Sequence, residues 1–441
     1  MKLFLISIIL IIFQSCSFDN KTGIWKNSNT VFEKEEGVFK EFETLSTSNK
    51  IFDKIINIDN KFKFVVPNPI INSNWSDIYY NETNNLNNFK YNDLGKLTFR
   101  SKKVSKSKTD HLLLFTNNNI ITSDQKGNII IFSINENKII TKFNFYKKKY
   151  KKIKKILNLI VDDYVIYVSD NLGYLYAYDY NKNKLLWAKN YKVPFRSNLK
   201  IFKQKLIAAN QSNNLLFFDK ASGKNLKSIP SEETTIKNDF VNSLSLNNEN
   251  LFFLNTYGSL YSIDSISMKI NWFINLNRSL DLNPNNLFKG NQVINNQNVV
   301  VVTTNQFTYI IDSKTGSIIY KKNFTSLIKP LIINDYLFLV TKNDLLVAVD
   351  LSDGDVIYSY DINQKIAEYL NTKKKTVQYK DIMMINSEIY IFLKNSYLLK
   401  FNIEGDLLKV NKLKSKINSQ PLVIDNSILY LDNKSKISIM N

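Results

Sequence analysis

The strongest constraint on the fold is a repeat that occurs eight times along the chain. Each copy contains an apolar run, a tight turn and a second apolar run that ends at Asp, Asn or Ser. Periods of roughly 40 to 50 residues, each holding several short strands, are typical of the blades of a β-propeller. The repeat therefore predicts an all-β chain with eight blades. The residues that end the second runs are Ser133, Asp179, Asp219, Asp264, Asp312, Asp350, Asn402 and Asn441.

The second copy illustrates the sequence pattern of one blade. A β-rich run at 165–168 is followed by a turn through Gly173 and a second run at 174–178. Asp179 then opens a turn, because its carboxylate can accept a backbone N–H two residues on. An outer strand begins at Leu185. Both inner runs are apolar at nearly every position, which is expected where a strand is buried on both faces. We therefore expect four-stranded antiparallel blades rather than a two-sheet sandwich, in which alternation is more regular.

The last copy stops at Asn441 and leaves no room for a fourth strand. The missing strand is expected from the N-terminal side of the first full copy, where residues 96–104 are the best candidate. Pairing the two ends in one blade would close the ring and remove exposed strand edges. The sequence thus predicts an eight-bladed ring that is closed by an N-terminal strand.

The amino terminus has the form of a targeting segment. Lys2 precedes an apolar stretch that ends at Phe13 and is too short to span a bilayer as a permanent helix. Cys16, the only Cys of the chain, follows at the distance found in a bacterial lipobox. We interpret residues 1–15 as a lipoprotein signal peptide and predict that Cys16 is acylated; the alternative is an ordinary secretory signal. Residues 16–67 are polar and irregular and are interpreted as a lipid-anchored tether, which leaves 68–441 for the propeller.

Composition narrows the chemistry. One Cys and one His exclude an intrachain disulfide and a Cys-based metal cluster, so we expect no metal site and no cofactor. His111, a lone His that abuts an apolar run at a strand start, is interpreted as structural. The formal charge of +20 comes with high Asn and Ile, so we interpret it as a solvated Lys-rich surface and expect no nucleic-acid partner. The run from Lys147 to Lys155 is either a solvated inter-blade loop or a contact for anionic lipid or an acidic partner.

Several copies share a longer motif that carries a family resemblance. They contain Asp-x-x-x-Gly-x-x-x-Tyr/Trp, as in Asp312 to Tyr320 and nearly so in Asp350 to Tyr358. This motif resembles the pyrroloquinoline-quinone-type propeller repeat. Together with the lipobox, residues 68 to 441 resemble the BamB family, the propeller lipoproteins of the outer-membrane β-barrel assembly machinery.

The resemblance implies a function and a location. Members of that family are non-enzymatic scaffolds, lipid-anchored on the periplasmic side of the outer membrane. They dock on the periplasmic domains of the barrel-assembly subunit and assist unfolded outer-membrane protein clients. We therefore expect these partners here, together with a membrane reached through the N-terminal lipid.

The resemblance also implies docking residues. In the family, an Arg lies in the loop after the outer strand of an early blade; the residue that matches it here is Arg196, with Phe195 as its apolar neighbour. Two acids precede the first strand of the next blade in the family. Asp239 matches the first, whereas the second position is Val241. The alternative roles are a loop Arg on a basic surface and a turn cap at Asp239.

Two other functions stay open. A quinone-dependent dehydrogenase would share this blade type, but it needs a metal beside the quinone, a catalytic Asp and, commonly, a vicinal Cys pair. The chain has one Cys and no dense carboxylate cluster in its inner strands, and the Asp residues that end the runs are explained by turn geometry. We therefore expect no enzyme activity and no catalytic residue. The other alternative is a propeller that binds polysaccharide.

Overall fold

The computed structural model describes residues 16–18, 25–27, 52–233, 240–277 and 288–441. The chain divides into two compact units, residues 1–50 and 51–441. In the first unit, β1 (Cys16–Phe18) pairs antiparallel with β2 (Trp25–Asn27). No helix among the described residues has the length and apolar character needed to cross a membrane.

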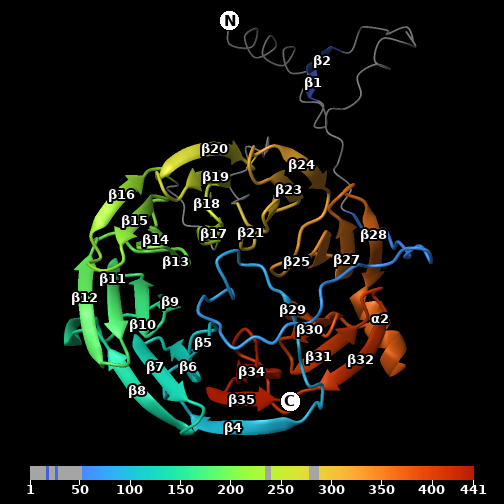
Figure 1. Cartoon of the computed structure of the whole chain (residues 1–441). Coiled ribbons are helices and arrows are strands. Elements are labelled where there is room, and N and C mark those ends of the chain that lie inside the picture. The colour runs from blue at the N-terminus through green and yellow to red at the C-terminus, as the bar shows by residue number, and fades with distance from the viewer. Residues whose placement is uncertain (1–15, 19–24, 28–51, 234–239, 278–287) are drawn as a thin grey trace, which may run out of the picture. The chain divides into compact units, whose positions relative to one another are not determined.

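The second unit is a ring of eight blades, and Figure 1 shows them arranged around a central axis. Each blade is built on four antiparallel strands, which in blades 1 to 7 follow chain order from the axis outward, and this confirms the predicted all-β propeller. Blade 1 consists of β5 (Leu114–Thr116), β6 (Asn119–Ser123), β7 (Asn128–Ser133) and β8 (Lys138–Asn144). Blade 2 consists of β9 (Leu157–Asp162), β10 (Val165–Asp170), β11 (Tyr174–Asp179) and β12 (Lys184–Asn190). Blade 3 consists of β13 (Lys200–Phe202), β14 (Lys205–Ala209), β15 (Leu215–Asp219) and β16 (Asn225–Ile229).

The next four blades repeat this order. Blade 4 consists of β17 (Ser243–Asn247), β18 (Asn250–Leu254), β19 (Ser259–Asp264) and β20 (Lys269–Asn275). Blade 5 consists of β21 (Ile294–Asn295), β22 (Val299–Thr303), β23 (Thr308–Asp312) and β24 (Ile318–Lys322). Blade 6 consists of β25 (Leu331–Ile333), β26 (Tyr336–Val340), β27 (Leu345–Asp350) and β28 (Val356–Asp361). Blade 7 consists of β29 (Tyr379–Ile385), β30 (Glu388–Leu393), β31 (Tyr397–Phe401) and β32 (Leu407–Lys412), with β3 (Asn88–Phe89) added parallel to β29.

The eighth blade is built from both ends of the propeller unit. Its first three strands are β33 (Leu422–Ile424), β34 (Ser427–Leu431) and β35 (Lys436–Met440), and its outer strand is β4 (Leu97–Lys103). In the register, Phe99 lies opposite Ile439 and Arg100 lies opposite Ser438. The strand pairing predicted for residues 96–104 is therefore confirmed. That this pairing stabilises the ring stays a prediction.

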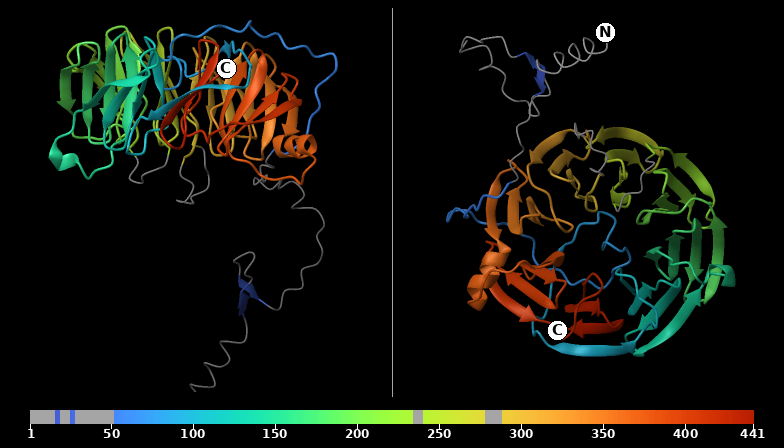
Figure 2. Two further views of the ribbon diagram at one scale, coloured as in Figure 1. Left: turned by 90° about the horizontal axis from the view of Figure 1, so that it is seen from below. Right: turned by 180° about the vertical axis from the view of Figure 1, so that it is seen from behind.

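The alternation of strand direction gives the ring two distinct faces. Turns from the first to the second strand and from the third to the fourth lie on one face, called here the turn face. Turns from the second to the third strand and the connections between blades lie on the other, called the loop face. The helix α2 (Ile362–Leu370) and the 3-10 helix η1 (Lys148–Tyr150) belong to connections between blades. Both therefore lie on the loop face, as the side view in Figure 2 shows for the orange helix and the turquoise loop.

The predicted turn role of the end residues follows from their hydrogen bonds. The Asp312 carboxylate accepts the backbone N–H groups of Lys314 at 3.0 Å and Thr315 at 2.7 Å. Gly316 then closes the turn with a φ of +76°. The ring of Trp272, from the outer strand of the preceding blade, lies against this glycine, so that a Cβ there would be 2.5 Å from it. The same arrangement recurs at Gly223 with Trp187, at Gly354 with Tyr320 and at Gly405 with Tyr358 and Tyr360.

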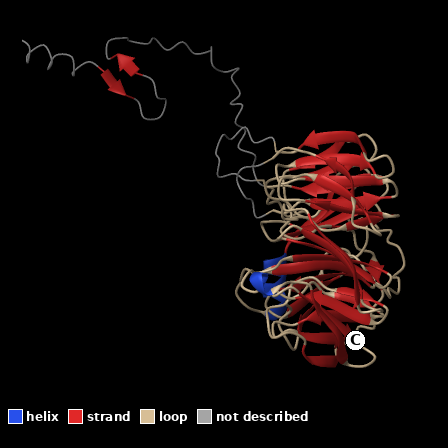
Figure 3. Ribbon diagram, turned by 90° about the vertical axis from the view of Figure 1, so that its left-hand side faces the viewer, coloured by secondary structure: helices blue, strands red, loops and turns tan. Residues whose placement is uncertain are grey.

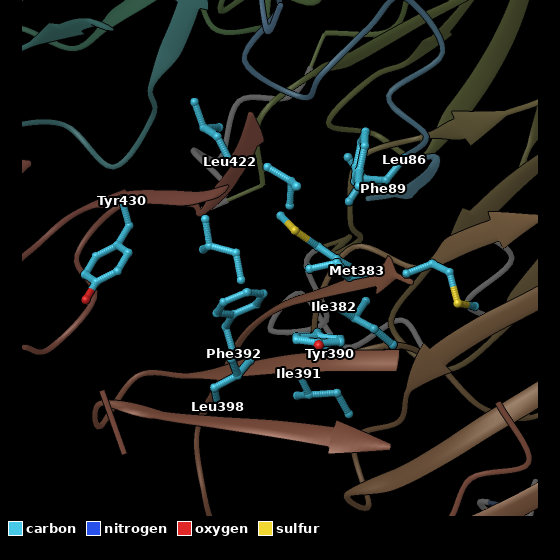
Figure 4. Packing of buried hydrophobic residues seen from close by; sticks show 14 of the residues in the cluster. Leu86, Phe89, Ile382, Met383, Tyr390, Ile391, Phe392, Leu398, Leu422 and Tyr430 are labelled. Carbon is cyan, nitrogen blue, oxygen red and sulfur yellow. The ribbon is translucent and has the colours of Figure 1, made fainter. Parts of the chain in front are cut away.

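The core is apolar packing within and between neighbouring blades. Figure 4 shows part of the largest cluster, which contains Met383 and Ile391 of blade 7 together with Leu86 and Phe89. Leu86 and Phe89 come from the segment that precedes β4, so residues far apart in the sequence share one core. All four side chains are at most 1% exposed. The N-terminal part of the propeller unit is therefore an integral part of its core.

Residues 52–66 run along the outside of blade 6. The Phe52 N–H donates to the Asn323 carbonyl at 3.2 Å on the loop face. Ile56 pairs with Ser359 of β28 through two backbone hydrogen bonds of 3.1 and 2.9 Å. At the turn face, the Asn334 side chain donates to the Val65 carbonyl at 3.3 Å. The region predicted as a tether, residues 16–67, thus includes a part that packs on the propeller.

Candidate functional site

Residues 70–89 pass through the centre of the ring and are called here the axial segment. Figure 1 shows this segment as the light-blue chain inside the ring of blades. Trp75 pairs with Phe115 of blade 1, and Asp77 pairs with Ile160 of blade 2. These contacts, and others to blades 4 to 8, fall near the ends of the innermost strands, so the segment lies at the turn face. The other contacts are Leu246 N–H to Glu82 O, Asn295 N–H to Thr83 O, Ile332 N–H to Asn85 Oδ1, Met384 opposite Asn88, and Asp425 N–H to Asn72 O.

A buried lysine of blade 3 organises the axial segment. Lys200 Nζ donates to Asp77 Oδ2 at 2.6 Å, to Asn84 Oδ1 at 2.7 Å and to the Asn81 carbonyl at 2.9 Å. The Lys200 side chain is 0% exposed and that of Asp77 is 5% exposed. Asn84, at a φ of +60°, also donates to two main-chain carbonyls of blades 4 and 5 at 2.8 Å each. All three hydrogen atoms of the ammonium group therefore take part in hydrogen bonds. Through Lys200 and Asn84, the segment is connected to blades 3, 4 and 5.

Burial dominates the electrostatics of this cluster. It lowers the pKa of Lys200 and raises the pKa of Asp77, while the attraction between the two charges opposes both shifts. Lys329, which donates to the Asn84 carbonyl at 2.6 Å, has its pKa lowered to about 8 by burial. Burial also raises the pKa of Asp381, a carboxyl of blade 7 that the charge of Lys329 partly compensates. Buried charges of this kind are tolerated only when they are paired and hydrogen-bonded.

The predicted docking loop connects blades 2 and 3 on the loop face. Phe195 is 3% exposed and packs between the rings of Tyr191 and Phe218, with centroids 6.0 Å away in each case. Its N–H donates to the Asp170 carbonyl at 2.9 Å. The structure therefore places Phe195 in the aromatic core, where its ring contacts fix the position of the loop.

Arg196 lies at the surface of the same loop and is partly exposed. Its N–H donates to the Ala209 carbonyl at 2.9 Å, and its own carbonyl accepts from the Asn242 N–H at 3.1 Å. The Arg196 backbone is thus held between blades 3 and 4. Asp239, the other predicted docking residue, lies outside the described residues, and Cys16 is the first residue of β1.

His111 is exposed at the start of blade 1. Its Nδ1 lies 3.0 Å from the Asn418 carbonyl, and burial lowers its pKa from the ordinary value. Within the described part of the chain, no group of three or more His, Cys, Asp or Glu side chains could hold a metal ion.

The axial segment was not predicted from the sequence. Its signal was available: Trp75 and Leu86, which are buried, stand among many Asn residues between 72 and 92. Asn side chains can hydrogen-bond to backbone groups and tolerate positive φ, which suits a loop that is buried without strand partners.

Comparisons with known proteins agree with this architecture. The sequence model of the family described as outer membrane protein assembly factor BamB matches residues 100–322 and 272–430. No curated protein sequence matches the chain. Among solved structures, BamB from Moraxella catarrhalis is similar with a TM-score of 0.62 at 11% identity, over 78% of this chain and 99% of that one.

Proteins with other roles share the fold. A quinohemoprotein alcohol dehydrogenase from Comamonas testosteroni is similar with a TM-score of 0.61 at 10% identity, over 83% of this chain and 80% of that one. The computationally designed protein Ika8 is similar with a TM-score of 0.57 at 10% identity, over 77% of this chain and 99% of that one. Because one fold carries an assembly factor, an enzyme and a design, the likeness between structures speaks for the fold alone.

Proposed function

Because the chain belongs to the family of the outer membrane protein assembly factor BamB, we propose that it is a scaffold lipoprotein without enzyme activity that assists the insertion of β-barrel proteins into the bacterial outer membrane. It docks on the periplasmic domains of the barrel-assembly subunit and brings unfolded outer-membrane protein clients to it. It is held on the periplasmic side of the membrane by acylation of Cys16. The observation that carries this proposal is the family match, which extends over nearly the whole ring of blades.

The geometry of the loop at Arg196 supports a docking role. Its backbone is fixed by hydrogen bonds to blades 3 and 4, and Phe195 anchors it in the core. A loop that is already ordered loses little conformational entropy on binding, so more of the contact energy appears as affinity. Arg is also among the residue types that contribute most at protein interfaces.

A quinone-dependent dehydrogenase is the second candidate, since an enzyme of that type shares the fold. Calcium in such a centre requires six to eight oxygen ligands. At the axis of this ring, the carboxylate of Asp77 is engaged by Lys200, and Asp381 faces the ammonium group of Lys329. The axial segment crosses the turn-face end of the ring and pairs there with the innermost strands. These residues do not fit a calcium–quinone centre, which favours the scaffold.

The test is retrieval of the partner from detergent-solubilised outer membranes. We expect wild-type protein to retrieve the barrel-assembly subunit, and Arg196→Glu to retrieve at least about tenfold less because the charge at the interface is reversed. The matched control is Lys189→Glu, which reverses an exposed charge on the outer strand of blade 2. Failure of the wild type to retrieve the subunit would contradict the proposed function. Equal retrieval by Arg196→Glu would contradict only the placement of the docking site.

A further inference from the structure

Charged side chains are sorted between the two faces of the ring. Exposed carboxylates gather on the turn face, whereas on the described part of the loop face the exposed carboxylates are those of Asp53, Glu233 and Glu368. The turn-face acids are Glu136, Asp163, Glu249, Asp335, Asp353, Asp355, Asp406 and Asp425. Exposed lysines dominate the loop face of blades 7, 8, 1 and 2: Lys106, Lys108, Lys126, Lys147, Lys148, Lys149, Lys151, Lys152, Lys154, Lys192, Lys394, Lys414, Lys416 and Lys434. The net positive charge is therefore concentrated on the loop face.

Residues 147–156, called here the lysine loop, form the densest part of this basic surface. Six of its lysines are exposed, and Ile153 and Ile156 are exposed by 42% and 53% between and after them. The loop is held from within, because the buried Lys155 donates to the Tyr150 carbonyl and lies 5.2 Å from the centre of the Tyr146 ring. Exposed aliphatic side chains beside exposed lysines are therefore a fixed feature of this surface.

A second projection on the loop face has the same composition. It comprises α2 and the residues after it, up to Lys375, and is called here the helix loop. Figure 3 shows α2 in blue at one face of the ring. Asp361 caps the helix by accepting the Gln364 N–H at 2.9 Å. Tyr369 and Leu370, at its end, are each 46% exposed, and three exposed lysines follow at 373–375.

The lysine loop and the helix loop project from the same face of the ring. The lysine loop joins blades 1 and 2 and the helix loop joins blades 6 and 7, so they are separated around the ring by blades 7, 8 and 1. Phe52, the first described residue of the propeller unit, also lies on the loop face, where its N–H donates to Asn323 O and its carbonyl accepts from the Asn343 side chain, both at 3.2 Å. The chain therefore enters the propeller unit on the face that carries both projections.

We propose that the loop face binds an anionic lipid surface through the lysine loop and the helix loop. Lysines near such a surface are attracted by its negative potential, each strengthening binding by roughly fivefold, and exposed apolar side chains enter the boundary between headgroups and acyl chains. The pairing of lysines with Ile153, Ile156, Tyr369 and Leu370 favours a lipid surface over an acidic protein, for which the charges alone would suffice.

The experiment measures sedimentation of the chain from residue 16 onward with lipid vesicles, with Cys16→Ser in every sample so that no acyl chain contributes. We expect binding to vesicles that contain phosphatidylglycerol, weakening with salt, and little binding to vesicles of phosphatidylcholine alone. Changing the lysine loop at Lys148, Lys149, Lys151 and Lys152 to Gln should weaken binding at least about tenfold. The matched control changes four exposed lysines of the turn face to Gln: Lys182, Lys203, Lys224 and Lys314.

A second variant separates the apolar contribution from the charge. Ile153→Ser with Ile156→Ser should weaken vesicle binding while leaving its salt dependence unchanged, because no charge is altered. Equal binding by the lysine-loop variant and the turn-face control, or equal binding to both kinds of vesicle, would overturn the proposal. So would absence of vesicle binding by a chain that binds a polyglutamate resin through the same lysines, since the surface would then be one for acidic polypeptides. The vesicles contain no protein, so these outcomes are independent of partner retrieval.

Discussion

At the scale of single residues, Lys200 shows what a local pattern cannot reveal. In the sequence it is one of many lysines and precedes two apolar residues of a short strand. In the structure it is fully buried, because Asp77 and Asn84 complete its hydrogen bonds from 123 and 116 residues away. A partner at that distance leaves no periodic signal. Phe195, which the family resemblance implied to be a docking residue, lies in the aromatic core against Tyr191 and Phe218.

Removing the charge of Lys200 should destabilise the whole ring. Lys200→Met leaves the carboxylate of Asp77 buried without its counter-charge, which costs about 3–5 kcal/mol in the free energy of unfolding. Urea denaturation measures the loss, and Lys189→Met, at an exposed position, is expected to change stability by less than about 0.5 kcal/mol. Adding Asp77→Leu to Lys200→Met should restore part of the loss, because the uncompensated charge is then absent. A Lys200→Met variant as stable as wild type would show that the cluster contributes nothing.

At the scale of elements, glycine in the turn between the third and fourth strands occurs together with an aromatic residue in the outer strand of the preceding blade. Wherever such a turn contains Gly, an aromatic residue from the preceding blade packs against it, as Trp272 does at Gly316. Blade 3 shows the converse: Lys227 lies in the register position that Trp272 has in blade 4, and Met268 replaces the glycine of the next turn at a φ of +56°. Such a turn requires glycine only where an aromatic ring occupies the space that a Cβ would need.

Two glycines at positive φ allow this packing to be measured. Gly316 and Gly95 have φ values of +76° and +65°, but a Cβ at Gly316 meets Trp272 at 2.5 Å, whereas one at Gly95 has no atom within 4 Å. Alanine at either site costs about 1–2 kcal/mol for the left-handed backbone. Gly316→Ala should cost roughly 1–3 kcal/mol more, since the indole must move. Chemical denaturation of the two variants gives the difference, and equal losses would mean that the ring shifts without cost.

The elements themselves were largely predictable, because each depends on its own short stretch of sequence. The apolar runs, the Gly173 turn and the capping role of Asp312 require only neighbours within about ten residues, and the structure shows all three. The strand at 96–104 was predicted by a different argument, that the last blade lacks a partner. No such argument applies to the axial segment. No blade lacks a strand at the place where Asp77 and Trp75 lie, so the repeat does not predict that a segment of chain lies there.

At the scale of the whole molecule, the two ends of the propeller unit contact each other. The outer strand of blade 8 comes from Leu97–Lys103, and its Arg100 forms an ion pair with Asp432, 332 residues later, whose side chain is fully buried. The axial segment adds contacts to all eight blades from within. Without β4, the outward edge of β35 would be unpaired and exposed to other chains.

Replacing residues 97–103 by a Gly–Ser sequence of equal length tests this closure. The replacement removes the ladder to β35 and leaves the carboxylate of Asp432 buried without Arg100, so we expect the thermal midpoint to fall by at least about 5 °C and aggregation to increase. The control is the same replacement of β16, an outer strand with mostly exposed side chains whose blade is contiguous in the sequence. Both variants lose one outer strand, but only the first loses the link between the ends. An unchanged midpoint in the first variant would show that the blades hold the ring closed without it, and a fall no larger than that of the β16 variant would show that β4 contributes as an ordinary outer strand.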